Sequence, residues 1–205
     1  MRGLREGGFL PGAVINTLAR LGWSPGGDGL LSLDALARAF DGSRLSKSPS
    51  VFDIDRLKSY NKNAIGSMPA DELLRLASVE GEGALRAAEA VKANAATLPE
   101  FRELIAPFTG QPAPAPEAAE ILSHAASKEV IRAAKEAVEH AGVMDEGAYR
   151  DIISEVKAAT GAKGRALFMP IRAALTGRTE GIELVNVFCL LGRERAAERL
   201  GRHAG

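Results

Sequence analysis

The residue types that usually carry out metal or covalent chemistry are few in this 205-residue sequence, and their spacing is unfavourable. Neither His124 nor His140 has a second metal ligand three or four residues further along the chain, and His203 lies almost at the end. Helical metal sites use that spacing, so no metal site is predicted. The single cysteine, Cys189, sits in the apolar run 185–191, which is typical of a buried core residue.

Acidic pairs and glycine clusters also have structural explanations. Asp71-Glu72 and Asp145-Glu146 stand where helices are expected to begin, and negative charge is favourable there. Residues 26–29 contain three glycines but are not followed by the Lys-Ser/Thr helix start of a phosphate-binding loop. The sequence therefore shows no catalytic centre and favours a binding protein.

Charged side chains are the remaining candidates for a functional role. Acidic and basic side chains balance at 26 each, but they are unevenly distributed. Residues 44–62 hold five basic and two acidic groups, and residues 161–205 hold eight basic and four acidic groups. Between them, residues 63–160 hold nine basic and sixteen acidic groups. Two local basic patches can contact phosphates even when the total charge is zero.

These side chains must be positioned by helices. Good helix formers dominate the composition, aromatic residues make up only 5%, and no strand ladder is visible, so an all-α fold is predicted. Apolar spacing and end signals predict helices over 10–21, 33–40, 54–60, from 69 onward, 82–96, from 97 onward, 117–126, 128–141, 146–159, 165–176 and 180–202.

Specific end signals support several of these helices. Asp53 and Ser32 are expected N-caps, and Thr97 with Glu100 has the spacing of a capping box. The alternating prolines of 107–116 predict an extended connector instead of a helix. One cysteine, no long apolar stretch and no signal-like start indicate a soluble, cytoplasmic protein.

Three segments carry a resemblance to bacterial-type glutamyl-tRNA synthetases. They are residues 5–24, which include Phe9-Leu10-Pro11-Gly12-Ala13; residues 45–57 followed by Asn61, which include Ser46-Lys47-Ser48-Pro49; and residues 169–181 followed by 190–195, which include Ala174-Leu175-Thr176-Gly177. The three occur in the family's order and at family-like distances. The resemblance covers 1–66 and 165–200 closely and the middle of the chain loosely.

Ser46-Lys47-Ser48 invites confusion with the ATP-site loop of class I synthetases. The resemblance assigns it instead to a second, downstream Ser-Lys-Ser, because it is followed by Pro-x-x-Phe-Asp. The ATP loop, the His-Ile-Gly-His-type signature and the nucleotide-binding sheet are not found in this sequence. No catalytic residue and no cofactor site are therefore expected here, and ATP and Mg²⁺ would belong to a separate catalytic domain.

The resemblance implies an elongated helical stem-contact domain over 1–66 and a helical anticodon-binding cage over 67–205, with a further division near 107–127. The partners it implies are tRNA, above all glutamate tRNA, and the catalytic half of a glutamate–tRNA ligase. The chain is expected to be a monomer. It is also expected not to activate glutamate on its own.

The resemblance also implies a set of tRNA-binding residues. Arg172 matches an arginine that faces the anticodon, although a surface or salt-bridged helix arginine is the alternative. Thr176, Gly181 and Leu184 lie on the adjoining turn, where Thr176 and Leu184 could equally serve as cap and core. Lys47 would touch the tRNA backbone or remain a solvated loop lysine. Arg165 and Arg178 complete the cationic set around this turn.

Asn94 departs from the family pattern. The alignment places it where glutamate-specific members carry an arginine that reads the last anticodon base. A neutral, shorter side chain would discriminate that base weakly, so glutamine tRNA could also be accepted. The alternative is an ordinary helix-end asparagine.

Two rival interpretations stay open. The chain could be a free-standing module that docks on a separately encoded catalytic half. Its N-terminal residues Phe9, Leu10, Leu18 and Trp23 would then form an exposed apolar face. Alternatively, it could be a helical scaffold unrelated to RNA.

Overall fold

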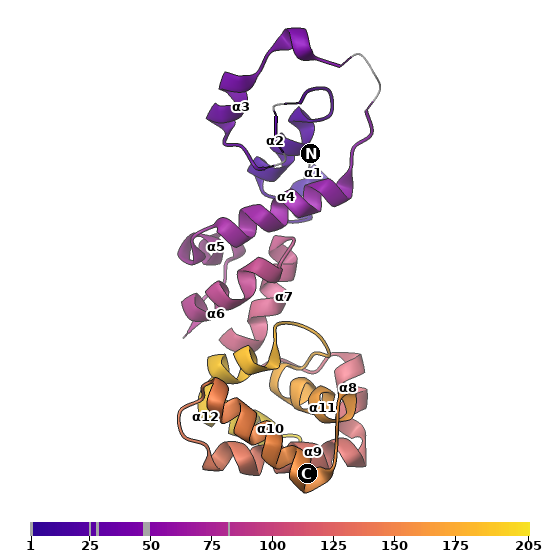
Figure 1. Ribbon diagram of the computed structural model, residues 1–205, viewed down its shortest axis with the longest axis vertical. Coiled ribbons are helices and arrows are strands. Elements are labelled where there is room, and N and C mark those ends of the chain that lie inside the picture. Colours follow the sequence, from indigo (N-terminus) through magenta and orange to yellow (C-terminus); the bar gives the residue numbers. More distant parts are fainter. Residues whose placement is uncertain (1, 25, 28, 47–49, 82) are drawn as a thin grey trace. The chain divides into compact units, whose positions relative to one another are not determined.

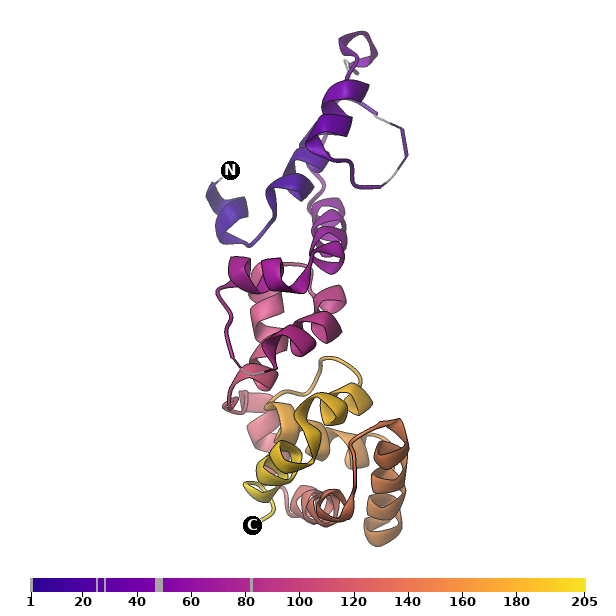
Figure 2. The same ribbon diagram turned by 90° about the vertical axis from the view of Figure 1, so that its left-hand side faces the viewer.

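A computed structural model describes residues 2–205 except 25, 28, 47–49 and 82. Within these residues every regular element is a helix, and both views show coiled ribbons without arrows (Figure 1; Figure 2). The all-α prediction is confirmed. The chain forms two compact units, unit 1 over 1–80 and 91–104 and unit 2 over 81–90 and 105–205. The predicted domain boundary after residue 66, which would divide a stem-contact domain from an anticodon-binding domain, stays a prediction.

Unit 1 contains the elements α1 (Arg2–Glu6), α2 (Pro11–Ala19), α3 (Leu33–Ala39), the 3₁₀ turns η1 (Gly42–Arg44) and η2 (Lys92–Asn94), α4 (Ile54–Ser67), α5 (Ala70–Ala77) and the start of α7 (Leu98–Thr109). Helices α2 and α4 pack together through a small core of Ala13, Val14, Leu57 and Tyr60. Burial of such side chains contributes on the order of 2 kcal/mol each.

One buried amide joins three parts of unit 1. The Asn61 side chain is fully buried in α4. Its Oδ1 accepts the Leu10 N–H at 2.7 Å, and its Nδ2 donates to the Ala96 carbonyl at 2.7 Å. Leu98 N–H also donates to the Gly8 carbonyl at 3.2 Å. The segment 8–10 and the turn before α7 are therefore held together by these buried and partly buried hydrogen bonds.

Unit 2 contains α6 (Ala84–Val91), the end of α7, α8 (Pro116–Ser123), α9 (Ala125–His140), α10 (Glu146–Thr160), α11 (Arg165–Thr176) and α12 (Leu184–Gly201). Its central element is α9, which packs against α10, α11 and α12. Fully buried side chains of α9 and α11, such as Ile131, Ala134 and Ile171, recur at helical spacing and build the core.

Three predicted helix starts are confirmed by their caps. Asp53 accepts the N–H groups of Asp55 and Arg56, and Ser32 accepts that of Ala35. In the capping box, Glu100 N–H donates to Thr97 Oγ1, while the Glu100 carboxylate accepts the Ala96 N–H. Helix α4 runs past its predicted end near residue 60 to Ser67, because Asn61 and Ile65 continue its buried face.

The prediction of an extended 107–116 segment is wrong at both ends. Pro107 lies inside α7, which reaches Thr109, and Pro116 opens α8 at a position where no N–H is needed. Two arginines of α12 stabilise this end of α7: Arg195 donates to the Phe108 carbonyl at 3.0 Å and Arg199 to the Gly110 carbonyl at 2.7 Å. These hydrogen bonds hold the end of α7 just beyond Pro107.

The region predicted as one helix over 180–202 is interrupted. Helix α12 starts at Leu184, and Gly192 inside it has φ 70° and ψ 174°, far from helical values. Similarly, the predicted 82–96 helix becomes α6 followed by the 3₁₀ turn η2, and the short helix α1 was not predicted at all. Because helices tolerate an isolated glycine, the presence of Gly192 in a helical pattern did not predict a break in the helix.

The prediction of an exposed apolar face near the N-terminus is also wrong in part. Leu10 and Trp23 are buried, and only Leu18 is appreciably exposed. The Trp23 ring meets Phe40 edge-on at 5.6 Å between centroids. Apolar exposure lies further along the chain instead, at Leu33, Phe40 and Val51. Among the helices that the structure describes, none is long and apolar enough to cross a membrane.

Candidate RNA-binding surface

Arg172 is the cation that helix α11 offers at the turn preceding α12. Its side chain is half-buried, and Nη1 donates to the Ile182 carbonyl at 2.8 Å. Burial lowers the pKa of the Arg172 guanidinium, and the nearby Tyr149 hydroxyl counteracts this shift. One of five N–H groups is used, so the rest of the planar fork remains for a ligand.

The turn after α11 is built by Thr176 and Gly177. Thr176 is buried, and its Oγ1 donates to the Arg172 carbonyl at 2.8 Å and accepts the Arg178 N–H at 3.2 Å. Gly177 has φ 68°, and a Cβ there would lie 2.9 Å from the Ala113 carbonyl oxygen. Only glycine fits this close approach, which fixes where the turn begins.

Gly181 and Leu184 complete the turn in different ways. Gly181 is exposed with φ 136°, and a Cβ there would stand 3.7 Å from Arg172 Nη1. Leu184 is buried at the start of α12. The structure therefore brings Arg172, Thr176, Arg178, Gly181 and Leu184 together, with Thr176 and Leu184 supporting the turn from beneath.

Tyr149 is a neighbour of this turn that sequence reasoning missed. It lies in α10, half-exposed, with its ring tilted against Phe188 at 5.6 Å between centroids. Burial raises the pKa of the Tyr149 hydroxyl, Arg172 opposes that shift, and Glu183 adds to it. Nothing in the spacing of the α10 residues marks this tyrosine, because its meeting with Arg172 depends on how α10 and α11 pack.

Arg165 extends the cationic surface along α11. It is exposed, and no hydrogen bond or ion pair links its side chain to another described residue. Seven residues make nearly two helical turns, so Arg165 and Arg172 share one side of α11, roughly 10 Å apart along its axis.

Asn94 belongs to unit 1 and is considered there alone. It ends the 3₁₀ turn η2, and its side chain is exposed without a hydrogen-bonding partner in the described structure. The following residues are fixed by Asn61 and Glu100 through Ala96. Asn94 therefore stands on a rigid turn with its amide free. Lys47 lies outside the described residues.

No group of three or more His, Cys, Asp or Glu side chains suitable for a metal ion occurs in the part of the chain that the structure describes. In unit 2, the surface around the turn after α11 presents arginines and the ring of Tyr149, which suit anionic or planar ligands.

Known relatives agree with this picture. The curated glutamate–tRNA ligases of Bacillus cereus, Syntrophus aciditrophicus and Halorhodospira halophila are 34%, 37% and 36% identical to the chain over 98% of its length. The chain spans about half the length of these relatives, between 42% and 45%.

Two solved glutamate–tRNA ligases have the same fold over 98% of the chain and 42% of their own length. The protein from Elizabethkingia meningosepticum has a TM-score of 0.77 at 22% identity, and that from Elizabethkingia anophelis has 0.73 at 23% identity. In addition, the profile of the anticodon binding domain family matches residues 47–204, which is most of the chain. The chain belongs to the anticodon-binding domain family.

Proposed function

We propose that this chain binds tRNA and that the turn around Arg172 reads the anticodon of glutamate tRNA. The supporting observation is the anchored guanidinium: Arg172 is held by the Ile182 carbonyl inside a region that matches the anticodon-binding profile. An anchored arginine offers a planar face and paired N–H groups, and unpaired anticodon bases are recognised by stacking and by hydrogen bonds to their edges.

Tyr149 supports the same proposal. Because its ring rests on Phe188 and its hydroxyl lies near Arg172, an aromatic face and a cation are available side by side. Such a pair can stack one base while hydrogen-bonding another. The exposed Arg165 would add a phosphate contact that positions the loop without reading sequence.

Asn94 is proposed to contact the last anticodon base. Its amide is neutral and shorter than an arginine side chain, so it would distinguish that base weakly. The chain is therefore expected to accept glutamine tRNA with an affinity closer to that for glutamate tRNA than an arginine at this position would permit. Asn94→Arg should increase the preference for glutamate tRNA.

Binding of the full chain to three purified tRNAs over a salt series tests the proposal. Glutamate tRNA, glutamine tRNA and an unrelated tRNA are compared by fluorescence anisotropy. The proposal predicts that glutamate tRNA binds more tightly than the unrelated tRNA. It also predicts that affinity falls with salt concentration. In a plot of log affinity against log salt concentration, each phosphate contact should add roughly 0.7–0.9 to the steepness of the slope. Equal binding of all three tRNAs would overturn anticodon reading.

The longer protein to which this region corresponds is proposed to be a glutamate–tRNA ligase, which adenylates glutamate with ATP and transfers it to tRNA. The isolated chain should be inactive, because no catalytic constellation is found in it. Glutamate- and tRNA-dependent pyrophosphate release above background by the chain alone would contradict this expectation.

A second candidate function is docking on a separate catalytic protein, and one observation favours it. Leu33 is 64%, Phe40 57% and Val51 88% exposed, all within unit 1. Exposed large apolar side chains are candidates for a contact surface where they lie together. Sedimentation of the chain with and without a glutamate–tRNA ligase catalytic domain would show a complex if this candidate is correct, and Phe40→Ser should weaken it.

A further inference from the structure

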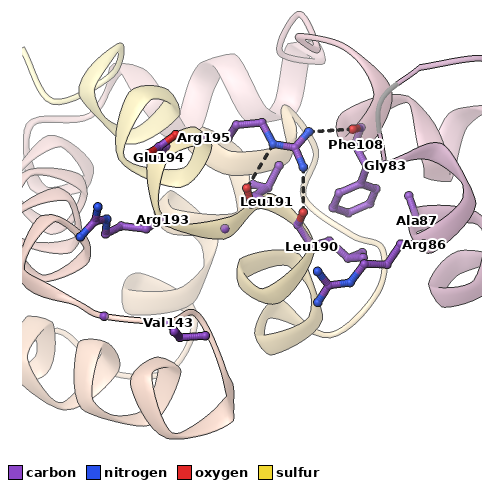
Figure 3. Close-up of a pocket in the computed structure, with 12 residues that line it drawn as sticks. Gly83, Arg86, Ala87, Phe108, Val143, Leu190, Leu191, Arg193, Glu194 and Arg195 are labelled. Atoms are coloured by element: carbon purple, nitrogen blue, oxygen red, sulfur yellow. Dashed lines mark hydrogen bonds between the residues drawn. The ribbon is translucent and has the colours of Figure 1, made fainter.

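Unit 2 contains an open cavity of about 830 Å³ that the anticodon assignment does not use. Its walls come from the start of α6, the end of α7, the loop between α9 and α10, and the break in α12 (Figure 3). None of Arg172, Thr176, Gly181 or Leu184 lines it. The cavity is therefore separate from the turn described above.

The break at Gly192 shapes this cavity. Because Gly192 leaves the helical conformation, the carbonyls of Leu190 and Leu191 lose their usual intrahelical partners. The Arg195 guanidinium replaces them, donating to Leu190 O at 2.8 Å, to Leu191 O at 3.1 Å and to Phe108 O at 3.0 Å (Figure 3). Three of the five Arg195 N–H groups are thus used by backbone carbonyls, so this side chain serves mainly to bridge the break.

Two other arginines at the cavity remain available. Arg86 is exposed, extends from α6 toward the cavity, and makes no hydrogen bond or ion pair with another described residue (Figure 3). Arg193 is exposed and makes only one long contact, 3.5 Å to the Ala141 carbonyl. Among the lining residues that the structure describes, Glu194 is the one acidic side chain, and it lies away from Arg86 (Figure 3). The described lining therefore carries three arginines and one glutamate.

We propose that this cavity binds the sugar–phosphate backbone of tRNA, with Arg86 and Arg193 contacting phosphates. The proposal rests on the tRNA-binding function proposed above. Guanidinium groups pair strongly with phosphate oxygens, and such contacts position RNA without reading its sequence. The other lining side chains, Ala87, Val143, Leu190 and Leu191, have no hydrogen-bonding groups, and the Phe108 ring is 97% buried and offers no stacking face.

The test replaces both arginines in the full chain, Arg86→Gln with Arg193→Gln, and uses Arg132→Gln as the matched control. Arg132 is also an exposed arginine of unit 2, and it does not line the cavity. Binding of glutamate tRNA and of an unrelated tRNA is measured across a salt series. An unchanged melting temperature verifies folding, as expected for exposed side chains.

The double variant should lose roughly tenfold in affinity for both tRNAs alike, because each exposed ion pair contributes at most about a factor of five. Its log–log salt slope should fall by roughly 1.4–1.8, about two phosphate contacts. A double variant that binds like Arg132→Gln overturns the cavity proposal while leaving the Arg172 assignment intact. A loss confined to glutamate tRNA also overturns it, because phosphate contacts are independent of sequence. If the unaltered chain binds no tRNA, both proposals fail.

Discussion

Helices α11 and α12 of unit 2 both carry arginines, but Arg199 of α12 and the two arginines of α11 have opposite surroundings. In α12, the Arg199 guanidinium is buried, donating to Leu175 O at 2.6 Å and to Gly110 O at 2.7 Å. In α11, Arg172 makes one hydrogen bond and Arg165 is exposed. Burial, aided by the neighbouring cations Arg195 and Arg202, lowers the pKa of Arg199 to about 10, so it is still charged at neutral pH.

The contrast between buried and exposed arginines shows why a count of basic residues overstates the number of cations available to bind RNA. Residues 161–205 carry four more basic than acidic groups, yet Arg195 and Arg199 are committed to backbone carbonyls. Arg195 and Arg199 of α12 hold the end of α7 and the end of α11 in place. The α11 arginines are then presented by that framework. Stability and recognition should therefore respond to different substitutions.

Arg199→Met should give the largest effect. It removes one buried and one partly buried hydrogen bond, to Leu175 O and to Gly110 O, which should cost about 3 kcal/mol in the free energy of unfolding. Urea unfolding followed by circular dichroism measures the loss. Arg202→Met, at the exposed C-cap residue just beyond the same helix, should change stability by less than about 0.5 kcal/mol. Equal losses in the two variants would contradict the division of roles.

Asn61→Leu extends the comparison to an uncharged anchor in unit 1. The Leu10 N–H and the Ala96 carbonyl would be left buried without partners, at a cost of about 2 kcal/mol. Trp23 is the only tryptophan and lies in unit 1, so its fluorescence reports this unfolding directly. The exposed neighbour Asn63→Leu should leave the transition in place. A shift of similar size there would remove the special role of Asn61.

Gly192→Ala tests whether the break in α12 is required. A side chain at φ 70° and ψ 174° is strained, and the expected loss is on the order of 1–3 kcal/mol. Gly12→Ala, inside α2 with open space around it, should be neutral or slightly stabilising by up to about 1 kcal/mol. A stabilised Gly192→Ala protein would show that α12 can be continuous and that Arg195 need not bridge the break.

Arg165→Lys should have the smallest effect. A lysine keeps the charge, and a phosphate contact needs little more, so tRNA affinity should change by less than about threefold. Anisotropy titration with glutamate tRNA measures this. A strong loss would mean that Arg165 also recognises its ligand through the planar guanidinium.

The sequence predicts most of the fold because local signals decide most boundaries. Gly164 and Gly177 flank α11, whose predicted span of 165–176 is the observed one, and the Asp53 cap and the Thr97–Glu100 box act within a few residues. Local signals mislead where distant partners decide. Helix α7 continues past Pro107, and α12 supplies donors to that end of the helix; Arg195 similarly bridges the break at Gly192.

The residues of the candidate site likewise fall into those that local sequence indicates and those that only the tertiary packing brings together. Arg172 and its turn are indicated by the resemblance of residues 169–181, whereas Tyr149 and the cavity beside Arg86 require the packing of helices distant in sequence. Charge patterning places cations near the C-terminus but does not separate Arg172 from Arg199. Only their surroundings do, since one guanidinium reaches the surface and the other is buried.

The central claim is that the anchored guanidinium of Arg172 reads the anticodon, and Arg172→Lys tests it most directly. The ratio of affinities for glutamate tRNA and an unrelated tRNA is measured before and after the substitution, with Arg132→Lys as control. Because lysine keeps the charge and loses the planar fork, the ratio should fall roughly tenfold toward unity while the salt slope stays nearly constant. An unchanged ratio in a variant that still binds tRNA would contradict the claim.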